Sequence, residues 1–253
     1  MIPQIAELSH HGVEFVSNVL LTPSRFDVWS TAQLAGFLGK YPTFDLGVQS
    51  AIRHHVLGGF WFAFCLFIFW VDGARPGGGR VRQRVLTTLF GAALAILFAH
   101  LLGLAISWLP PSRDPALAHF YPQYLIQNIN DNSFPSDSTA LYAAVAAGIF
   151  SLNRLLGVVL FVLVILFVSL PRMFVGGHYP TDIFAGLVLG LLGYFVARRF
   201  MKLWLHRYVD QIFERASWIR VVGEFIVFVW IVQIGVEFAE VVWIKNGLAQ
   251  ILK

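Results

Sequence analysis

Six stretches of the chain are almost continuously apolar, and short polar or glycine-rich segments separate them. They span 56–72, about 86–109, 134–152, 155–170, 183–197 and about 221–243. A helix that crosses a membrane needs about 20 consecutive, largely apolar residues, and these runs approach or reach that length. The pattern therefore predicts an all-α integral membrane protein, a helical bundle of about six transmembrane helices.

Residues 1–55 do not continue this pattern. They are only moderately apolar, and Pro23 and Pro42 interrupt them. Because proline breaks a helix interior, we expect interfacial or re-entrant helices here. The chain is then divided into this N-terminal segment, a transmembrane core over 56–197, and a C-terminal part over 198–253. The last part is a basic cytoplasmic stretch followed by an additional transmembrane helix.

Composition supports a membrane protein and excludes several other classes. Of the 253 residues, 57% are hydrophobic and 13% are charged, against about 25% charged in an ordinary soluble domain. The formal net charge of +4 indicates cytoplasmic loops and contact with membrane lipids, and not nucleic-acid binding, because Lys and Arg gather on the cytoplasmic side of membrane proteins. The single cysteine, Cys65, can form neither an internal disulfide nor a zinc site.

Lysine and arginine counts predict the orientation in the membrane. If 73–84 is cytoplasmic, eleven basic residues share its side: Arg75, Arg80, Arg82, Arg84, Arg154, Arg198, Arg199, Lys202, Arg207, Arg215 and Arg220. Seven lie on the other side: Arg25, Lys40, Arg53, Arg113, Arg172, Lys245 and Lys253. By the positive-inside tendency, the loops over 110–135 and 171–182 face outward, so together they can form one site.

The outward loop over 171–182 contains the pattern R-x5-H-x3-D, formed by Arg172, His178 and Asp182. A helix that begins at Pro180 would bring the Asp182 carboxylate to one imidazole nitrogen. A carboxylate in that position fixes the tautomer and raises the basicity of the other nitrogen, which can then attack phosphorus as a nucleophile. We therefore expect His178 and Asp182 to be catalytic residues.

Other residues of the two outward loops are suited to bind the oxygens of a phosphoryl group. Arg172 and Arg113 carry guanidinium groups, which fit two phosphate oxygens at once. Gly176 and Gly177 allow the backbone to come close to an oxyanion. The sequence thus predicts a phosphate site that includes Arg172, Arg113 and Gly177.

The stretch FPSDST, residues 134–139, begins the third apolar run. We expect Pro135 in the first turn of a helix, where its missing N–H costs nothing. The free N–H groups at that helix end, together with the hydroxyls of Ser136 and Ser138, form a natural phosphate site. The alternative is that one of these serines only caps the helix.

These motifs resemble those of a known family. PSDS and RMFVGGHYPTD are similar to the second and third signature motifs of the type 2 phosphatidic acid phosphatase superfamily. They are nearest in look to the bacterial undecaprenyl-diphosphate phosphatases, where the second motif commonly reads F-P-S-D-H. The resemblance covers about 61–193. It implies a multi-pass protein of the bacterial inner membrane whose site faces the periplasm and needs neither a metal nor a cofactor.

The resemblance also implies a role for each matched residue. His178 is the nucleophile that forms a phosphohistidine, and Asp182 orients it. Arg172 and Arg113 bind the phosphoryl oxygens, together with Ser136 and backbone N–H groups of the second motif. The implied activity is that of a metal-independent phosphatase acting on a lipid phosphate or diphosphate.

The sequence departs from the family pattern in three places. In the first motif, K-x6-R-P, Ile106 stands where the lysine belongs, and Asp114 separates Arg113 from the proline. Pro171 replaces the serine that usually precedes the third-motif arginine. Ser138 stands where the family has the second-motif histidine, which is its general acid for the leaving group.

The missing general acid predicts the substrate class. General acid catalysis contributes roughly 10²–10⁴-fold, and an alkoxide leaving group needs it far more than the weakly basic phosphate monoester that leaves from a diphosphate. We therefore predict hydrolysis of a polyprenyl or other lipid diphosphate, with His119 as an alternative source of the proton. Two other functions stay open: phosphoryl transfer to a lipid or sugar hydroxyl, and a catalytically dead scaffold or lipid-binding protein that kept the fold.

The C-terminal part places charge at both membrane faces. Arg198, Arg199 and Lys202 are expected along the cytoplasmic surface, where they meet anionic lipid headgroups. The last apolar run contains four polar residues, Glu224, Gln233, Glu237 and Glu240. Acidic groups at membrane depth are costly and often functional, and the last two glutamates are expected at the outer interface.

Overall fold

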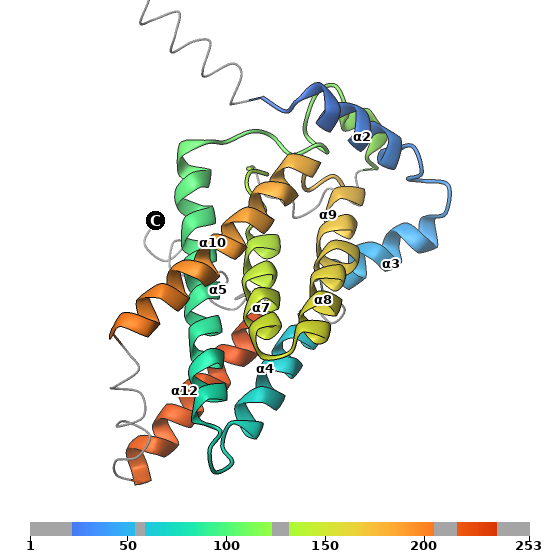
Figure 1. Ribbon diagram of the computed structural model, residues 1–253. Coiled ribbons are helices and arrows are strands. Elements are labelled where there is room, and N and C mark those ends of the chain that lie inside the picture. Colours follow the sequence, from blue (N-terminus) through green and yellow to red (C-terminus); the bar gives the residue numbers. More distant parts are fainter. Residues whose placement is uncertain (1–21, 54–58, 123–131, 205–216, 237–253) are drawn as a thin grey trace, which may run out of the picture.

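The computed structural model describes residues 22–53, 59–122, 132–204 and 217–236, and every regular element in these ranges is a helix (Figure 1). The all-α fold predicted from the sequence is therefore confirmed. In chain order the elements are α2 Arg25–Ala35, α3 Pro42–Arg53, α4 Phe60–Asp72, α5 Gly79–Ala105, η1 Ala118–Phe120, α7 Asp137–Leu152, α8 Arg154–Leu163, η2 Val164–Ser169, α9 Leu170–Phe174, α10 Pro180–Trp204 and α12 Ser217–Gly235.

Three helices in the described ranges are long and apolar enough to cross a membrane: Gly79–Ala105, Arg154–Phe174 and Pro180–Lys202. Three shorter apolar helices accompany them: Phe60–Asp72, Asp137–Leu152 and Val221–Gly235. Each corresponds to one of the six apolar runs of the sequence. The chain is thus a helical membrane protein, as the composition predicted.

Helix α7 forms the centre of the bundle, between α5, α8 and α10 (Figure 1). Residues 138–149 of this helix are all buried. Its 16 residues give a length of about 24 Å, shorter than the roughly 30 Å hydrocarbon core of a bilayer. A short helix fits this central place, because the longer helices around it extend past its ends.

Small residues let α10 approach the centre closely. A Cβ atom added at Gly186 would lie 2.5 Å from the Ser136 carbonyl oxygen, and one at Gly190 would lie 2.5 Å from the Ala140 carbonyl oxygen. Backbones can come this near only where side chains are absent, as in other small-residue contacts between membrane helices. The contact fixes the start of α7 beside the start of α10, where the candidate site lies.

Helices α8 and α9 are joined into one helix by a π-helical turn, η2. Pro171 lies just after it and has no N–H to donate to a carbonyl one turn earlier, and a wider π turn accommodates such a break. The sequence interpretation placed the end of this helix at Leu170 and a loop over 171–182. That was wrong, because the helix continues past the proline to Phe174, and Arg172 is helical.

Two other expected boundaries also differ. The segment over 73–84 is not a turn throughout, because α5 already begins at Gly79. The same helix ends at Ala105 and not near residue 109. The final run was expected to reach residue 243, but the described part of α12 ends at Gly235, so the expected places of Glu237 and Glu240 lie outside the described residues.

The N-terminal helices α2 and α3 pack against α9, and α2 also contacts α10 (Figure 1). Ser24 and Asp27 form a capping box at the start of α2. The Asp27 carboxylate is fully buried and also accepts a hydrogen bond from the Thr181 backbone N–H at 3.1 Å. The opposite surface exposes aromatic side chains, including Phe26 and Trp29. The proposed division of the chain into three parts stays a prediction.

A polar cluster ties α12 to α4 and α5 at the far end of the bundle. The Glu224 carboxylate lies 2.7 Å from the Arg82 guanidinium and accepts a hydrogen bond from the Trp70 indole N–H at 2.6 Å. The Arg82 guanidinium also lies over the Trp70 ring, 4.5 Å from its centroid. Glu224, an acidic residue that would be costly unpaired at membrane depth, is therefore paired with Arg82.

Candidate active site

The loop between α9 and α10 carries the third motif and is held in a narrow turn. Gly176 has a φ of +77°, and a Cβ atom there would lie 2.5 Å from the Tyr121 ring. Both features require glycine. The Gly176 carbonyl accepts a hydrogen bond from the Ser112 N–H at 3.0 Å. This bond docks the turn that contains Arg113 onto the third motif, so two distant segments meet here.

His178 is held by a backbone carbonyl. Its Nδ1 lies 2.7 Å from the Ser133 carbonyl oxygen, and its side chain is 12% exposed. A carbonyl oxygen can only accept, so Nδ1 carries the proton and donates it. In the neutral imidazole the lone pair is then on Nε2. The position of Ser133 therefore leaves Nε2 as the ring nitrogen with an available lone pair.

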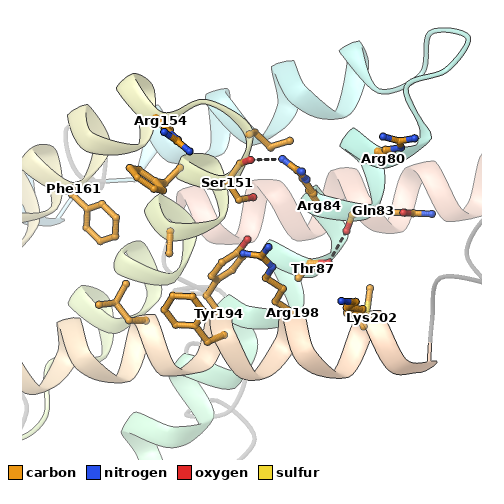
Figure 2. Close-up of a pocket in the computed structure, with 16 residues that line it drawn as sticks. Arg80, Gln83, Arg84, Thr87, Ser151, Arg154, Phe161, Tyr194, Arg198 and Lys202 are labelled. Carbon is orange, nitrogen blue, oxygen red and sulfur yellow. Dashed lines mark hydrogen bonds between the residues drawn. The ribbon is translucent and has the colours of Figure 1, made fainter.

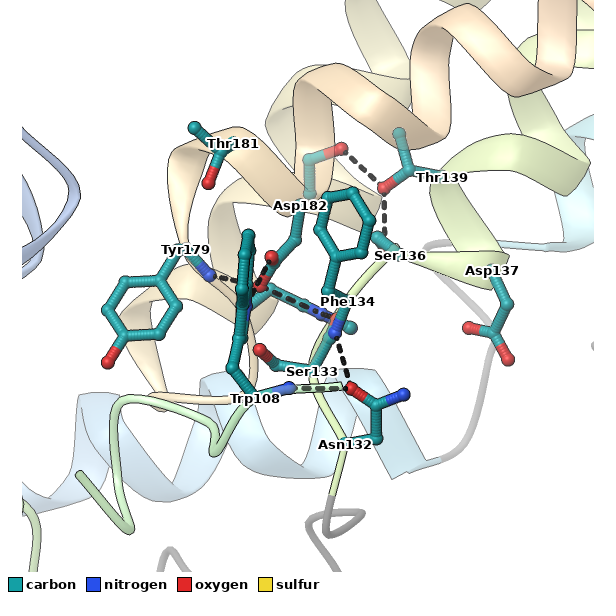
Figure 3. Close-up of polar contacts among 12 residues, drawn as sticks. Trp108, Asn132, Ser133, Phe134, Ser136, Asp137, Thr139, Tyr179, Thr181 and Asp182 are labelled. Atoms are coloured by element: carbon teal, nitrogen blue, oxygen red, sulfur yellow. Dashed lines mark hydrogen bonds and ion pairs between the residues drawn. The ribbon is translucent and has the colours of Figure 1, made fainter. Parts of the chain in front are cut away.

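Asp182 lies close to His178 but its carboxylate is bonded elsewhere. One oxygen is 3.7 Å from the His178 Nδ1, beyond hydrogen-bond distance. The carboxylate is fully buried, and it accepts hydrogen bonds from the Trp108 indole N–H at 3.0 Å and from the Tyr179 backbone N–H at 2.7 Å (Figure 3). The helix start at Pro180 is as predicted. The direct hydrogen bond between carboxylate and imidazole is replaced by a longer electrostatic contact.

The second motif is fastened to the third. The Ser136 backbone N–H donates to the Asp182 carbonyl at 3.1 Å. The Ser136 hydroxyl is buried and lies 2.9 Å from that of Thr139, which in turn lies 3.1 Å from that of Ser169 (Figure 3). Both polar groups of Ser136 are thus used inside the protein. Its role as a phosphate ligand stays a prediction.

Helix α7 starts two residues later than the sequence indicated. Ser136 is the N-cap and Asp137 the first helical residue, so Pro135 precedes the helix, after a cis Phe134–Pro135 bond. No side chain caps this helix end. Ser138 is 5% exposed, and its N–H donates to the Asp137 carboxylate at 2.7 Å. The residue in place of the family's histidine is therefore buried in the first turn of α7.

The two arginines of the predicted site belong to different segments of the chain. Arg172 is half-buried in the last turn of α9, and its carbonyl accepts the Gly177 N–H at 2.8 Å. The Gly177 N–H is therefore used within the loop. Arg113 is exposed in the turn that Ser112 docks beside Gly176. The phosphate-binding roles of Arg172, Arg113, Ser138 and Gly177 stay predictions.

Tyr179 joins the first-motif turn to the third motif. Its hydroxyl donates to the Asp114 carboxylate at 2.7 Å. Burial raises the pKa of Tyr179 well above its usual value, and the neighbouring carboxylates of Asp114 and Asp182 raise it further. The phenol therefore stays protonated and keeps donating at any ordinary pH, which secures the loop next to His178.

Comparison with known proteins places these motifs in a family. Residues 84–206 match the profile of the PAP2 superfamily, and this range contains all of the site residues described above. The chain carries a PAP2 superfamily domain. The resemblance to the type 2 phosphatidic acid phosphatases that the motifs indicated is confirmed.

Three curated relatives match part of the chain. The bacitracin transport permease protein BcrC of Bacillus licheniformis is 30% identical over 133 residues, which is 53% of this chain and 61% of that protein. The undecaprenyl-diphosphatase BcrC of Bacillus subtilis (strain 168) is 28% identical over 151 residues, 60% of this chain and 72% of that protein. The putative undecaprenyl-diphosphatase YbjG of Escherichia coli (strain K12) is 26% identical over 153 residues, 56% of this chain and 69% of that protein.

These alignments are partial. The chain spans 61% of the length of the Bacillus licheniformis protein, which is less than two thirds. No solved structure matches the chain at a significant level.

The PAP2 domain also uses residues that the sequence interpretation missed. Ile106, in place of the first-motif lysine, is the C-cap that follows α5, and two residues later Trp108 reaches the buried carboxylate of Asp182. Neither Trp108 nor the Ser133 carbonyl carries a signal in the sequence, because an indole in a loop is common and every residue has a carbonyl. His119, the alternative acid, is exposed and packs against Phe120 with the rings tilted and their centroids 4.0 Å apart.

Proposed function

We propose that the PAP2 domain hydrolyses a polyprenyl or other lipid diphosphate through a phosphohistidine on His178. The observation that carries this proposal is the 2.7 Å contact between the His178 Nδ1 and the Ser133 carbonyl, which leaves the Nε2 lone pair available. Nucleophilic catalysis by an imidazole divides one difficult displacement into two easier ones.

In the first step Nε2 attacks the terminal phosphorus. A P–N bond forms, the bond between phosphorus and the bridging oxygen breaks, and the lipid monophosphate leaves with the electron pair of that bond. Because Nδ1 keeps its proton, the phosphorylated imidazole carries a positive charge. The Asp182 carboxylate, 3.7 Å away, stabilises that charge. In the second step water attacks the same phosphorus and the P–N bond breaks. Inorganic phosphate is released, and the neutral imidazole is regenerated.

Two arginines would bind the non-bridging oxygens. Arg172 precedes the His178 loop directly, and Arg113 lies in a turn that is hydrogen-bonded to the same loop through Ser112. Guanidinium groups pair with phosphate oxygens through parallel hydrogen bonds. The start of α7 adds the positive end of a helix dipole, which the Asp137 carboxylate in its first turn partly offsets.

The substrate class follows from the residue at position 138. A serine hydroxyl is a far weaker acid than an imidazolium, so the leaving group must depart with little protonation. A lipid monophosphate does so much more readily than an alkoxide, and this favours a diphosphate over phosphatidate. The printed name of the Bacillus subtilis relative, an undecaprenyl-diphosphatase, supports undecaprenyl diphosphate as the substrate to test first.

The location proposed for the enzyme is a bacterial inner membrane, with His178 facing the periplasm. The arginine-rich start of α5 lies at the end of the bundle away from α2 and α9 (Figure 1). Basic segments of membrane proteins remain on the cytoplasmic side, which leaves the His178 end outside. A site on that face receives lipid diphosphates whose headgroups are in the outer leaflet.

The test measures phosphate release in detergent from undecaprenyl diphosphate and from phosphatidate. Wild type is expected to release phosphate from the diphosphate far faster, and His178→Ala is expected to abolish release. His100→Ala is the matched control, because this exposed histidine on α5 contacts the Ile96 carbonyl of its own helix, its one hydrogen bond within the described residues. Equal rates on both lipids would contradict the substrate class. No release by a folded wild type would favour a catalytically dead protein, and a phosphorylated added alcohol would favour transfer.

A further inference from the structure

A basic cavity lies at the opposite end of the bundle from His178. Its volume is about 860 Å³, and the ends of α5, α7, α8 and α10 enclose it (Figure 2). Five basic side chains line it: Arg80, Arg84, Arg154, Arg198 and Lys202. No acidic residue is among the lining residues. The cavity therefore concentrates positive charge between helices.

The cavity is distinct from the candidate active site. Ser151, at the end of α7, lines the cavity, whereas Ser136, just before the start of the same helix, lies beside Asp182 in the candidate active site. Fifteen residues of helix correspond to about 23 Å. The two sites are therefore about a membrane leaflet or more apart, and one phosphate group cannot occupy both. By the positive-inside tendency, the cavity faces the cytoplasm.

The charges of the cavity are largely uncompensated within the described part of the chain. The Arg84 guanidinium donates to the Ser151 carbonyl at the end of α7, which is a helix end that favours a cation. The described residues offer Arg80, Arg154, Arg198 and Lys202 no ion pair. Cations gathered in this way repel one another at low effective dielectric constant. An anion bound among them would relieve that repulsion.

The walls of the cavity are apolar. Phe150, Phe161, Leu191 and Phe195 line it, and the Phe195 side chain is 57% exposed. A soluble anion uses only the cations, whereas a phospholipid uses the cations for its phosphate and the apolar wall for its acyl chains. Tyr194 lies one helical turn before Arg198, so its hydroxyl shares that face of α10 (Figure 2).

We propose that this cavity binds the headgroup of an anionic phospholipid from the cytoplasmic leaflet, with preference for a headgroup that carries two phosphates. Basic pockets between membrane helices suit such headgroups. Five cations can neutralise two phosphate charges with hydrogen bonds to spare. The inference does not depend on the reaction proposed for His178.

The experiment titrates the full chain, in neutral detergent, with cardiolipin and follows binding by native mass spectrometry. Wild type is expected to bind cardiolipin saturably and phosphatidylcholine much more weakly. The double variant Arg154→Gln/Arg198→Gln is expected to lower the affinity about 30-fold, since each basic residue near an anionic lipid surface contributes about a factor of five. Both side chains are exposed, so thermal unfolding should be unchanged.

Arg199→Gln is the matched control, because this exposed neighbour of Arg198 does not line the cavity. Retained affinity in Arg199→Gln supports the site. Equal losses in the control and in the double variant would mean that surface charge alone attracts the lipid, and undiminished binding by the double variant would also overturn the proposal.

Competition by inorganic diphosphate separates a lipid site from a soluble-phosphate site. Inorganic diphosphate should displace cardiolipin only at large excess. Displacement at equal concentration would overturn the lipid assignment. Phe195→Ala should weaken cardiolipin binding and leave diphosphate binding unchanged.

Discussion

Replacing Asp182 by Asn removes one negative charge beside the proposed nucleophile and keeps the size of the side chain. The charge matters most when His178 is phosphorylated, because Nδ1 then keeps its proton and the ring becomes cationic. The interaction acts on a state that forms during the reaction and is weak before it. The substitution should therefore lower kcat much more than it changes KM.

The magnitude follows from the 3.7 Å separation of the carboxylate oxygen and Nδ1. Coulomb's law gives about 4.5 kcal/mol at an effective dielectric constant of about 20, and about 1 kcal/mol in bulk water. The fully buried position of Asp182 favours the upper part of that range. Since about 1.4 kcal/mol corresponds to a factor of ten in rate, we expect phosphoenzyme formation to slow about 100- to 1000-fold.

The assay is a single-turnover measurement with enzyme in excess over a diphosphate labelled in its terminal phosphate. Acid-labile phosphoenzyme is quantified at short times. Asp72→Asn is the control, because that carboxylate is paired with Arg75 at the far end of the bundle and should not affect the rate. A folded Asp182→Asn protein that forms phosphoenzyme at more than a third of the wild-type rate would refute the electrostatic role.

Three further predictions concern packing, substrate choice and positioning. Gly190→Leu should lower the midpoint of thermal unfolding clearly, because a Cβ there would lie 2.5 Å from the Ala140 carbonyl and overpacking costs about 1–3 kcal/mol or more. Gly47→Leu is the control and should leave the midpoint unchanged, because Gly47 has open space around it. Equal midpoints for the two variants would contradict the packing argument. Ser138→His should raise phosphatidate hydrolysis by roughly 10²-fold or more, measured as phosphate release, with a smaller gain on the diphosphate; an equal gain on both would argue against the leaving-group explanation. Trp108→Phe removes the N–H donor to the buried Asp182 carboxylate. An unsatisfied buried acceptor costs about 1–3 kcal/mol, so kcat should fall by about tenfold. An unchanged kcat in the same assay would show that the indole only fills space.

Local sequence was sufficient for the helices and for part of the site. Uninterrupted apolar runs can bury their backbone polar groups in a membrane only as helices, so the all-α fold followed directly. The helix start at Pro180 was also predicted, but the hydrogen bond expected between Asp182 and His178 is a longer contact of 3.7 Å, because His178 precedes the helix and its Nδ1 bonds the Ser133 carbonyl. Boundaries were less certain, as the helix that continues through Pro171 shows.

Tertiary structure decided which atoms surround the proposed catalytic residues. The Trp108 indole meets Asp182 across 74 positions of sequence, and the Ser133 carbonyl meets His178 across 45. Such contacts depend on how α5, α7 and α10 pack. Every residue has a backbone carbonyl, so the sequence does not indicate which carbonyl will accept a hydrogen bond in the site. The basic cavity arose in the same way, because three helices, α5, α8 and α10, carry its basic residues and only their packing gathers the charges around one space. The sequence determined the helices and the chemical groups, and the close packing of small residues determined which of those groups meet.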